Sequence, residues 1–174
     1  MNDYSYYTLP TKEIVTPAAR GHANDWRLLR RLALPPRMNE PQGGTIKRAL
    51  VLDVETTGLS HETDEVIQLA MLPFTYEVDT GRILEIELDR AFDSLRQPSL
   101  PISEEASIIT GITDDMVAGH SIDGAAIEAM IADADLIIAH NVSFDRPMVE
   151  KHWPCFAEKP WGCTLSSINW LDEG

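Results

Sequence analysis

The chain has 174 residues, 44 % of them hydrophobic, and a formal net charge of −14 at pH 7. Its length supports one sizeable core, so we expect a single domain with an appendage. The charge is uneven: residues 1–48 hold 8 Lys and Arg against 4 Asp and Glu, and residues 49–174 hold 6 against 24. Such an acidic body argues against wide, non-specific binding of duplex nucleic acid, which depends on lysine and arginine at the phosphates.

Neither end of the sequence has a membrane or secretory pattern. No apolar run reaches the roughly 18 residues of a membrane-spanning helix, and the start Met1-Asn2-Asp3-Tyr4 lacks the layout of a signal peptide. We therefore expect a soluble, cytoplasmic protein without a membrane partner. Cys155 and Cys163 match no disulfide framework or zinc pattern, and for His152 with Cys155 we favour packing over a small metal clip.

Residues 1–45 are predicted to form a mostly irregular arm, because they contain five prolines and the pair Gly43-Gly44. Within the arm, residues 24–33 have helical spacing, with an apolar stripe that includes Trp26. This pattern predicts a helix packed on the body with solvated arginines. The alternative is that its arginines contact a nucleic-acid backbone or a partner. Residues 46–174 are predicted to form the main domain.

The next feature is a strand that carries two acids. The apolar run Ala49–Val54 predicts a strand buried on both faces of a sheet. Asp53 and Glu55 should project from the same side, roughly 6 to 7 Å apart, because side chains alternate along a strand. Paired carboxylates are either solvated, share a proton or bind a cation, and Mg²⁺ and Mn²⁺ prefer such oxygens. The alternative is a strand that ends in an acidic surface loop.

The following segments predict an α/β fold. Residues 65–72 and 82–88 read as strands joined by a turn at Asp79-Thr80-Gly81, so that three strands form an antiparallel meander. Ser103 can cap a helix that Gly111 ends, and a second short helix starts at Thr113. A helix over 122–132 followed by a strand over 135–139 predicts a crossover to a parallel strand, and residues 161–164 predict a further strand.

Two motifs carry a family resemblance. Val51–Leu59, read as VLDVETTGL, resembles the first motif, D-x-E-T-T-G, of the DEDD superfamily of 3′-to-5′ exonucleases. His140–Asp145, read as HNVSFD, resembles the second motif, H-N-x-x-F-D, whose aspartate lies in the first turn of a helix and faces the first strand. Pro147 should be tolerated in that first turn. The resemblance implies a ribonuclease H-like mixed sheet flanked by helices, in the histidine subclass that includes the DNA polymerase III epsilon subunit.

The resemblance also implies a site and a reaction. Asp53, Glu55 and Asp145 would ligate two Mg²⁺ or Mn²⁺ ions, which hydrolyse the terminal phosphodiester of single-stranded nucleic acid at its 3′ end, with DNA favoured. DNA polymerase or other replication and repair proteins would be partners. The residues implied to contact substrate are Thr56, Thr57, Gly58, Leu59, His140, Asn141 and Phe144. For Phe144 a core role is equally open, and His140 would be a neighbour of the site, not its general base.

The family's third motif, an aspartate preceded by a histidine or tyrosine, is absent from the printed sequence. After Asp145 the one histidine is His152, and the residue five positions later is Ala157. We therefore expect an exonuclease domain that is incomplete at its C-terminus and weak or inactive. The alternatives are a non-catalytic binding module of the same fold and an RNA-directed exoribonuclease of the same superfamily.

Overall fold

The computed structural model describes residues 34–173, which belong to one compact unit. The helix predicted over residues 24–33 lies outside the described residues. No helix of the described part is long and apolar enough to cross a membrane.

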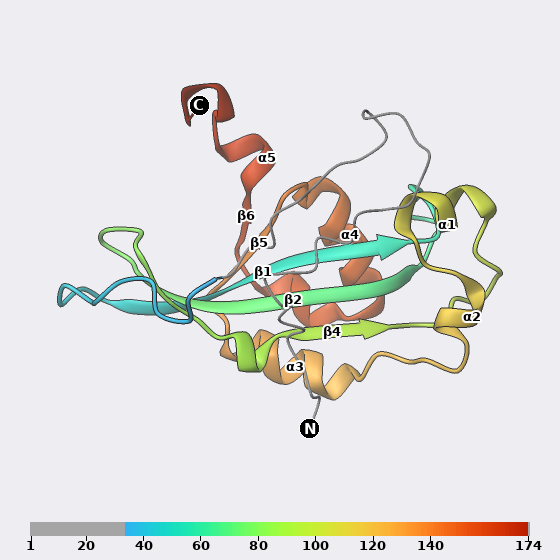
Figure 1. Cartoon of the computed structure of the whole chain (residues 1–174), viewed down its shortest axis with the longest axis horizontal. Coiled ribbons are helices and arrows are strands. Elements are labelled where there is room, and N and C mark those ends of the chain that lie inside the picture. Colours follow the sequence, from blue (N-terminus) through green and yellow to red (C-terminus); the bar gives the residue numbers. More distant parts are fainter. Residues whose placement is uncertain (1–33, 174) are drawn as a thin grey trace, which may run out of the picture. The chain divides into compact units, whose positions relative to one another are not determined.

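A six-stranded mixed sheet forms the centre of the body (Figure 1). Its order is β3-β2-β1-β5-β6, and β4 pairs with a second stretch of β2. Strands β1, β2, β3 and β4 are antiparallel neighbours, whereas β5 runs parallel to β1 and β6 runs parallel to β5. The bounds are β1 Ile46–Thr56, β2 Val66–Glu77, β3 Ile83–Ile86, β4 Phe92–Leu95, β5 Leu136–Ala139 and β6 Trp161–Cys163.

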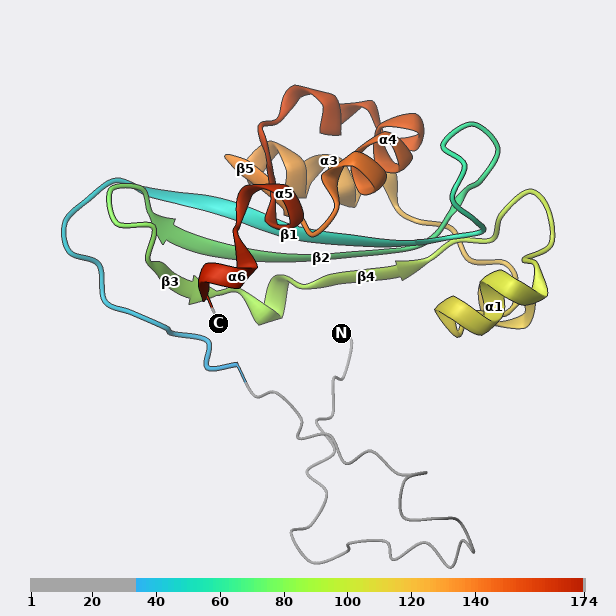
Figure 2. The ribbon, with the colours of Figure 1, turned by 90° about the horizontal axis from the view of Figure 1, so that it is seen from above.

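Helices flank this sheet on both sides. Figure 2 shows α3 (Gly124–Asp133) and α4 (Val142–His152) on one side and α1 (Glu104–Thr110) on the other. The larger core lies between the sheet and α3, α4 and the 3-10 helix η3 (Pro154–Glu158), and it includes Leu52, Ile127 and Phe156. A smaller core forms where Ile67 of β2 meets α1 and α2 (Asp114–Val117). The remaining short elements are η2 (Leu88–Arg90), α5 (Thr164–Ser167) and α6 (Trp170–Glu173).

Most of the predicted elements are confirmed. The antiparallel meander forms with its turn at Gly81, which has a φ of 69°, and the crossover through α3 leads to the parallel strand β5. Ser103 caps α1 by accepting a hydrogen bond from the Ala106 amide at 3.1 Å, and Gly111 ends the helix with a φ of 75°. The sequence did not predict β4, which pairs with residues 68–71 of β2.

Two local predictions were wrong. β1 is not buried on both faces, because Val51 is 44 % exposed while Leu50 and Leu52 are buried. The parallel partner β5 is short and pairs only with Ala49, Leu50 and Val51, and beyond Val51 the acid Asp53 is exposed. Pro147 does not lie in the first turn of its helix, because α4 begins at Val142 and places the proline in the second turn.

Candidate functional site

The first two acids of the site lie at the C-terminal end of β1. Leu52 and Val54 are buried in the core, and Asp53 and Glu55 alternate with them on the opposite face, as predicted from the strand period. Asp53 is exposed and Glu55 is half-buried. Burial raises the pKa of Glu55, and the negative charge of Asp53 raises it further. The two carboxyl groups are therefore close enough to interact.

The third acid, Asp145, comes from α4 and is only 4 % exposed. The carbonyl oxygen of Asn141 accepts hydrogen bonds from the amides of Phe144 and Asp145 and starts the helix. Burial raises the pKa of Asp145 to about 6, and the charge of Asp53 adds to this increase. Hydrogen bonding from the backbone of Val54 in β1 lowers the pKa of Asp145 and so opposes this increase. The charge of Asp53 thus raises the pKa of both other acids, and Asp145 lies against β1.

This donor set fits a hard divalent cation. All three side chains offer carboxylate oxygens, the ligands that Mg²⁺ and Mn²⁺ prefer. A buried, ionised Asp145 is unfavourable at neutral pH, and a bound cation would relieve that cost. Within residues 34–173 no three His, Cys, Asp or Glu side chains are already gathered closely enough to hold an ion.

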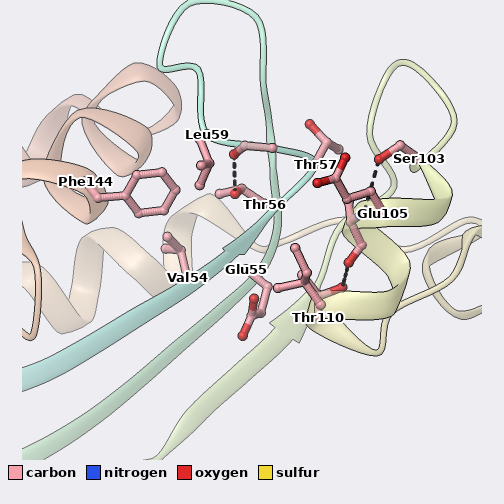
Figure 3. A pocket seen from close by; sticks show the side chains of 12 residues that line it. Val54, Glu55, Thr56, Thr57, Leu59, Ser103, Glu105, Thr110 and Phe144 are labelled. Atoms are coloured by element: carbon pink, nitrogen blue, oxygen red, sulfur yellow. Dashed lines mark hydrogen bonds between the residues drawn. The ribbon is translucent and has the colours of Figure 1, made fainter.

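A pocket of about 390 Å³ opens beside Glu55. In Figure 3, Val54, Leu59 and Phe144 lie at one end of the pocket, and Ser103, Glu105 and Thr110 of the α1 segment lie at the other. The turn after β1 separates the two ends. Of the three acids of the site, Glu55 alone contributes to the lining, which comprises Val54, Glu55, Thr56, Thr57, Gly58, Leu59, Ser103, Glu105, Ala106, Ile109, Thr110 and Phe144.

The loop after β1 is shaped by hydrogen bonds to Asp64. Its carboxylate accepts a bond from the Thr57 hydroxyl at 2.9 Å and another from the Ser60 amide at 2.8 Å. The same carboxylate lies against Gly58, where an added Cβ would be 2.6 Å from its Oδ2. From α4, the Lys151 ammonium donates to the carbonyl oxygens of Glu62 and Asp64 at 3.0 and 3.1 Å. These contacts join the loop that presents Gly58 to the helix that carries Asp145.

The structure brings six of the ten predicted site residues to the pocket and leaves four outside it, of which two are the acids Asp53 and Asp145. Glu55, Thr56, Thr57, Gly58, Leu59 and Phe144 are among its lining residues. His140 lies elsewhere, with its Nδ1 3.0 Å from the Thr164 hydroxyl, and Asn141 serves as the N-cap residue of α4. The Phe144 ring has a partner in His61, with ring centroids 5.7 Å apart.

Sequence reasoning missed the wall that α1 contributes. Ser103, Glu105, Ala106, Ile109 and Thr110 all line the pocket. The sequence has no local signal for this contact, and only the structure shows that Ala106 and Ile112 belong to the core around α1 while the pair Ile108-Ile109 does not. Both isoleucines are 76 % exposed. Exposed apolar side chains at the edge of a pocket are typical of binding sites.

Comparison with known proteins identifies relatives of this body. The RNase_T family profile, described as an exonuclease, matches residues 50–160. PolC-type DNA polymerase III of Lacticaseibacillus paracasei is 34 % identical over 111 residues, which are 63 % of this chain and 7 % of that polymerase. The Staphylococcus aureus enzyme of the same name is 32 % identical over 123 residues, 66 % of this chain and 8 % of the polymerase. The chain thus spans less than a tenth of the length of these relatives.

A solved structure supports the fold. The metal-free complex of E. coli exonuclease I with single-stranded DNA superposes with a TM-score of 0.50 at 19 % identity, covering 68 % of this chain and 28 % of that one. The mixed sheet flanked by helices is therefore the predicted ribonuclease H-like fold. Because the exonuclease profile covers most of the described body, the chain belongs to the RNase_T exonuclease family of the DEDD superfamily.

Proposed function

We propose that the body is a metal-dependent 3′-to-5′ exonuclease domain that acts on single-stranded nucleic acid, with DNA favoured, and releases nucleoside 5′-monophosphates. The observation that carries this proposal is that Asp53 interacts with both Glu55 and Asp145, and that Glu55 lines a pocket of about 390 Å³. The PolC-type polymerases among the relatives favour DNA as the substrate and replication or repair proteins as partners.

Each acid has a distinct role in the proposed reaction. Two Mg²⁺ or Mn²⁺ ions, when bound, would stabilise the attacking and the leaving oxygen of the phosphodiester. Asp53 would hold both ions, because it interacts with both other acids. Glu55 would hold one ion and accept a hydrogen bond from the attacking water. Asp145 would add a ligand from α4, and its burial would keep bulk water from that side of the site.

The pocket would receive the terminal nucleotide. The turn Thr56–Gly58 lines the pocket and would contact the sugar and phosphate of this nucleotide. Leu59, which is 83 % exposed, and Phe144 at the same end of the pocket would contact its base or sugar (Figure 3). Burial of apolar surface would supply most of the affinity for the base, at roughly 25 cal/mol per Å².

We expect slow turnover, because no described side chain is placed as the general base. His152, the one histidine after Asp145, is 5.4 Å from the Trp153 ring, and its Nε2 is buried without a hydrogen-bond partner in the described part. Burial lowers the pKa of His152, with Arg96 as the next contributor. A general base typically contributes about 10²- to 10⁴-fold to the rate, so binding should survive better than hydrolysis.

The first test concerns the metal. Adding Mn²⁺ should raise the melting temperature, because a ligand bound only by the folded state stabilises it by mass action. Asp53→Ala should abolish this increase, since it removes the acid that interacts with both others. Asp89→Ala, which removes an exposed acid of η2, is the matched control and should keep the increase. An equal increase in Asp53→Ala would place the ion elsewhere.

The second test distinguishes an enzyme from a binding module. Single-stranded DNA and RNA, labelled at the 5′ end, are incubated with the chain and Mn²⁺, and the products are sized. Slow loss of nucleotides from the 3′ end, faster for DNA and absent in Asp53→Ala, is the expected result. Faster trimming of RNA would identify the exoribonuclease alternative. Mn²⁺-dependent binding without any trimming would support the binding module, and fast processive trimming would contradict the expectation of slow turnover.

A further inference from the structure

The pocket proposed for the terminal nucleotide has no cationic side chain in its lining. Its charged groups are the carboxylates of Glu55 and Glu105, and the remaining lining is made of hydroxyl, backbone and apolar groups. Glu105 lies in the first turn of α1 and is exposed. A phosphate that enters this pocket therefore meets two like charges and no protein cation.

The nine Lys and Arg side chains of residues 34–173 are all engaged by other groups of the body. Six of them form ion pairs with acids, namely Arg37, Lys47, Arg48, Arg90, Arg96 and Arg146. The other three donate to neutral oxygens: Arg82 to the Asn39 side chain, Lys151 to the loop after β1, and Lys159 to the carbonyls of Ala132 and Ala134. A nucleic-acid backbone along this surface would have to displace these partners.

Four of these ion pairs form a closed network. Arg48 and Arg90 each bond to both Glu87 and Asp133, at 2.7 to 3.0 Å. The hydrogen bond between Arg90 and Asp133 is the main cause that raises the pKa of Arg90 and lowers the pKa of Asp133. Displacing either arginine would remove one of the two cations that Glu87 and Asp133 share. These cations are therefore poorly available for phosphate.

The charge of the body leads to the same conclusion. Residues 34–174 hold 9 Lys and Arg against 25 Asp and Glu, a net charge of −16. Phosphates that lie beyond the pocket gain no attraction from such a surface, although salt screens the repulsion over about 8 Å at physiological ionic strength. Proteins that track a single strand do the opposite, with a positively charged groove along the backbone.

We propose that this site recognises the terminal nucleotide alone, with divalent cations as its phosphate-binding charge, so that its substrate class is short oligonucleotides and the last nucleotides of longer single strands. This inference rests on the proposed function and deepens it. Affinity should be nearly independent of strand length, because added nucleotides bring phosphates for which the body has no partner. It should also depend little on monovalent salt, because few protein cations release counterions.

The test measures binding of single-stranded deoxythymidine oligonucleotides by titration calorimetry with Mn²⁺. A dinucleotide, a pentanucleotide and a fifteen-nucleotide strand are compared, each with a phosphorothioate at the terminal linkage to slow hydrolysis. The full chain is used together with a variant in which Arg20, Arg27, Arg30 and Arg31 are all replaced by Gln, which removes the arginines of the N-terminal arm. Glu105→Lys, with Glu105→Gln as its matched control, places a cation at the pocket edge.

In the arginine-replaced variant we expect the three Kd values to agree within about threefold, and to change by less than about threefold between roughly 50 and 200 mM salt. Glu105→Lys should bind the longer strands more tightly than Glu105→Gln and should acquire a salt dependence. A rise in affinity of about tenfold or more with length in the arginine-replaced variant would overturn this inference and leave the proposed function intact. Absence of Mn²⁺-dependent binding at every length would overturn the proposed function itself.

Discussion

Asp64 is the residue that sets the shape of the loop on which Gly58 and Leu59 reach the pocket. It belongs to neither family-like motif, yet its carboxylate accepts bonds from both Thr57 and Ser60 across the loop. Gly58 packs against the same carboxylate, since a Cβ there would lie 2.6 to 2.8 Å from all three carboxyl atoms of Asp64 and would force that side chain to move. An acid outside the proposed metal site thus positions the residues that would bind the nucleotide.

We predict that Asp64→Ala weakens binding of a nucleoside 5′-monophosphate more than it reduces stability. Losing the two hydrogen bonds should cost on the order of 1 to 2 kcal/mol of loop order, which is about fivefold to thirtyfold in Kd. Titration calorimetry with thymidine 5′-monophosphate and Mn²⁺ measures this change, and a melting curve measures stability. Glu62→Ala removes an acid from the same loop and is the matched control. Equal affinities in both variants would remove Asp64 from the site.

At the scale of elements, the strands and helices could be predicted where one local signal dominates. Ser103 and Gly111 mark both ends of α1, and the turn at Gly81 separates β2 from β3, so these bounds follow from capping and turn chemistry. The long strand β2 could not be fully anticipated. It pairs with β3 through residues 74–76 and with β4 through residues 68–71, an arrangement that depends on tertiary pairing and not on local pattern.

The candidate site shows the same division between local and tertiary information. Asp53 and Glu55 could be placed on one face of β1 from the strand period, whereas Asp145 could be named only from the resemblance of its motif to the family. The α1 wall could not, because its contact with the turn after β1 joins segments about 50 residues apart. The burial of Asp145, and hence the rise of its pKa, also depends on packing that the sequence does not specify locally.

At the scale of the whole body, residues 34–45 are irregular, as predicted, and they are fastened along the sheet at two places. Near β3, the Met38 amide donates to the Leu84 carbonyl at 2.8 Å, and the Ile86 amide donates to the Pro36 carbonyl at 2.7 Å. At the end of β2, the Glu77 carboxylate accepts bonds from the amides of Gln42 and Gly44, both at 2.8 Å. The segment thereby covers the outer edge of the meander, where an open strand would invite aggregation.

Glu77 makes the stability of the body depend on pH. It is 1 % exposed, and hydrogen bonds from the Gly44 amide, the Thr80 hydroxyl and the Gln42 amide lower its pKa below the unfolded value of 4.5. An acid whose pKa is lower in the folded state stabilises that state above its unfolded pKa. This contribution is lost as the pH falls through the folded pKa. Protonation therefore loosens the attachment of residues 42–44.

We predict that Glu77→Gln lowers the melting temperature at neutral pH, because a neutral amide oxygen accepts the bonds from Gln42 and Gly44 more weakly than a carboxylate does, and the amide nitrogen cannot accept the bond from the Thr80 hydroxyl. The difference from the unmodified chain should shrink as the pH falls below about 4.5, because Glu77 is protonated first in the unfolded chain and then, at its lower folded pKa, in the native chain. Melting curves between neutral and acidic pH measure this convergence. Glu85→Gln, at an exposed position of β3, is the control and should show little difference at any pH. A difference between Glu77→Gln and the unmodified chain that stays constant down to strongly acidic pH would show that the charge of Glu77 does not hold the segment in place.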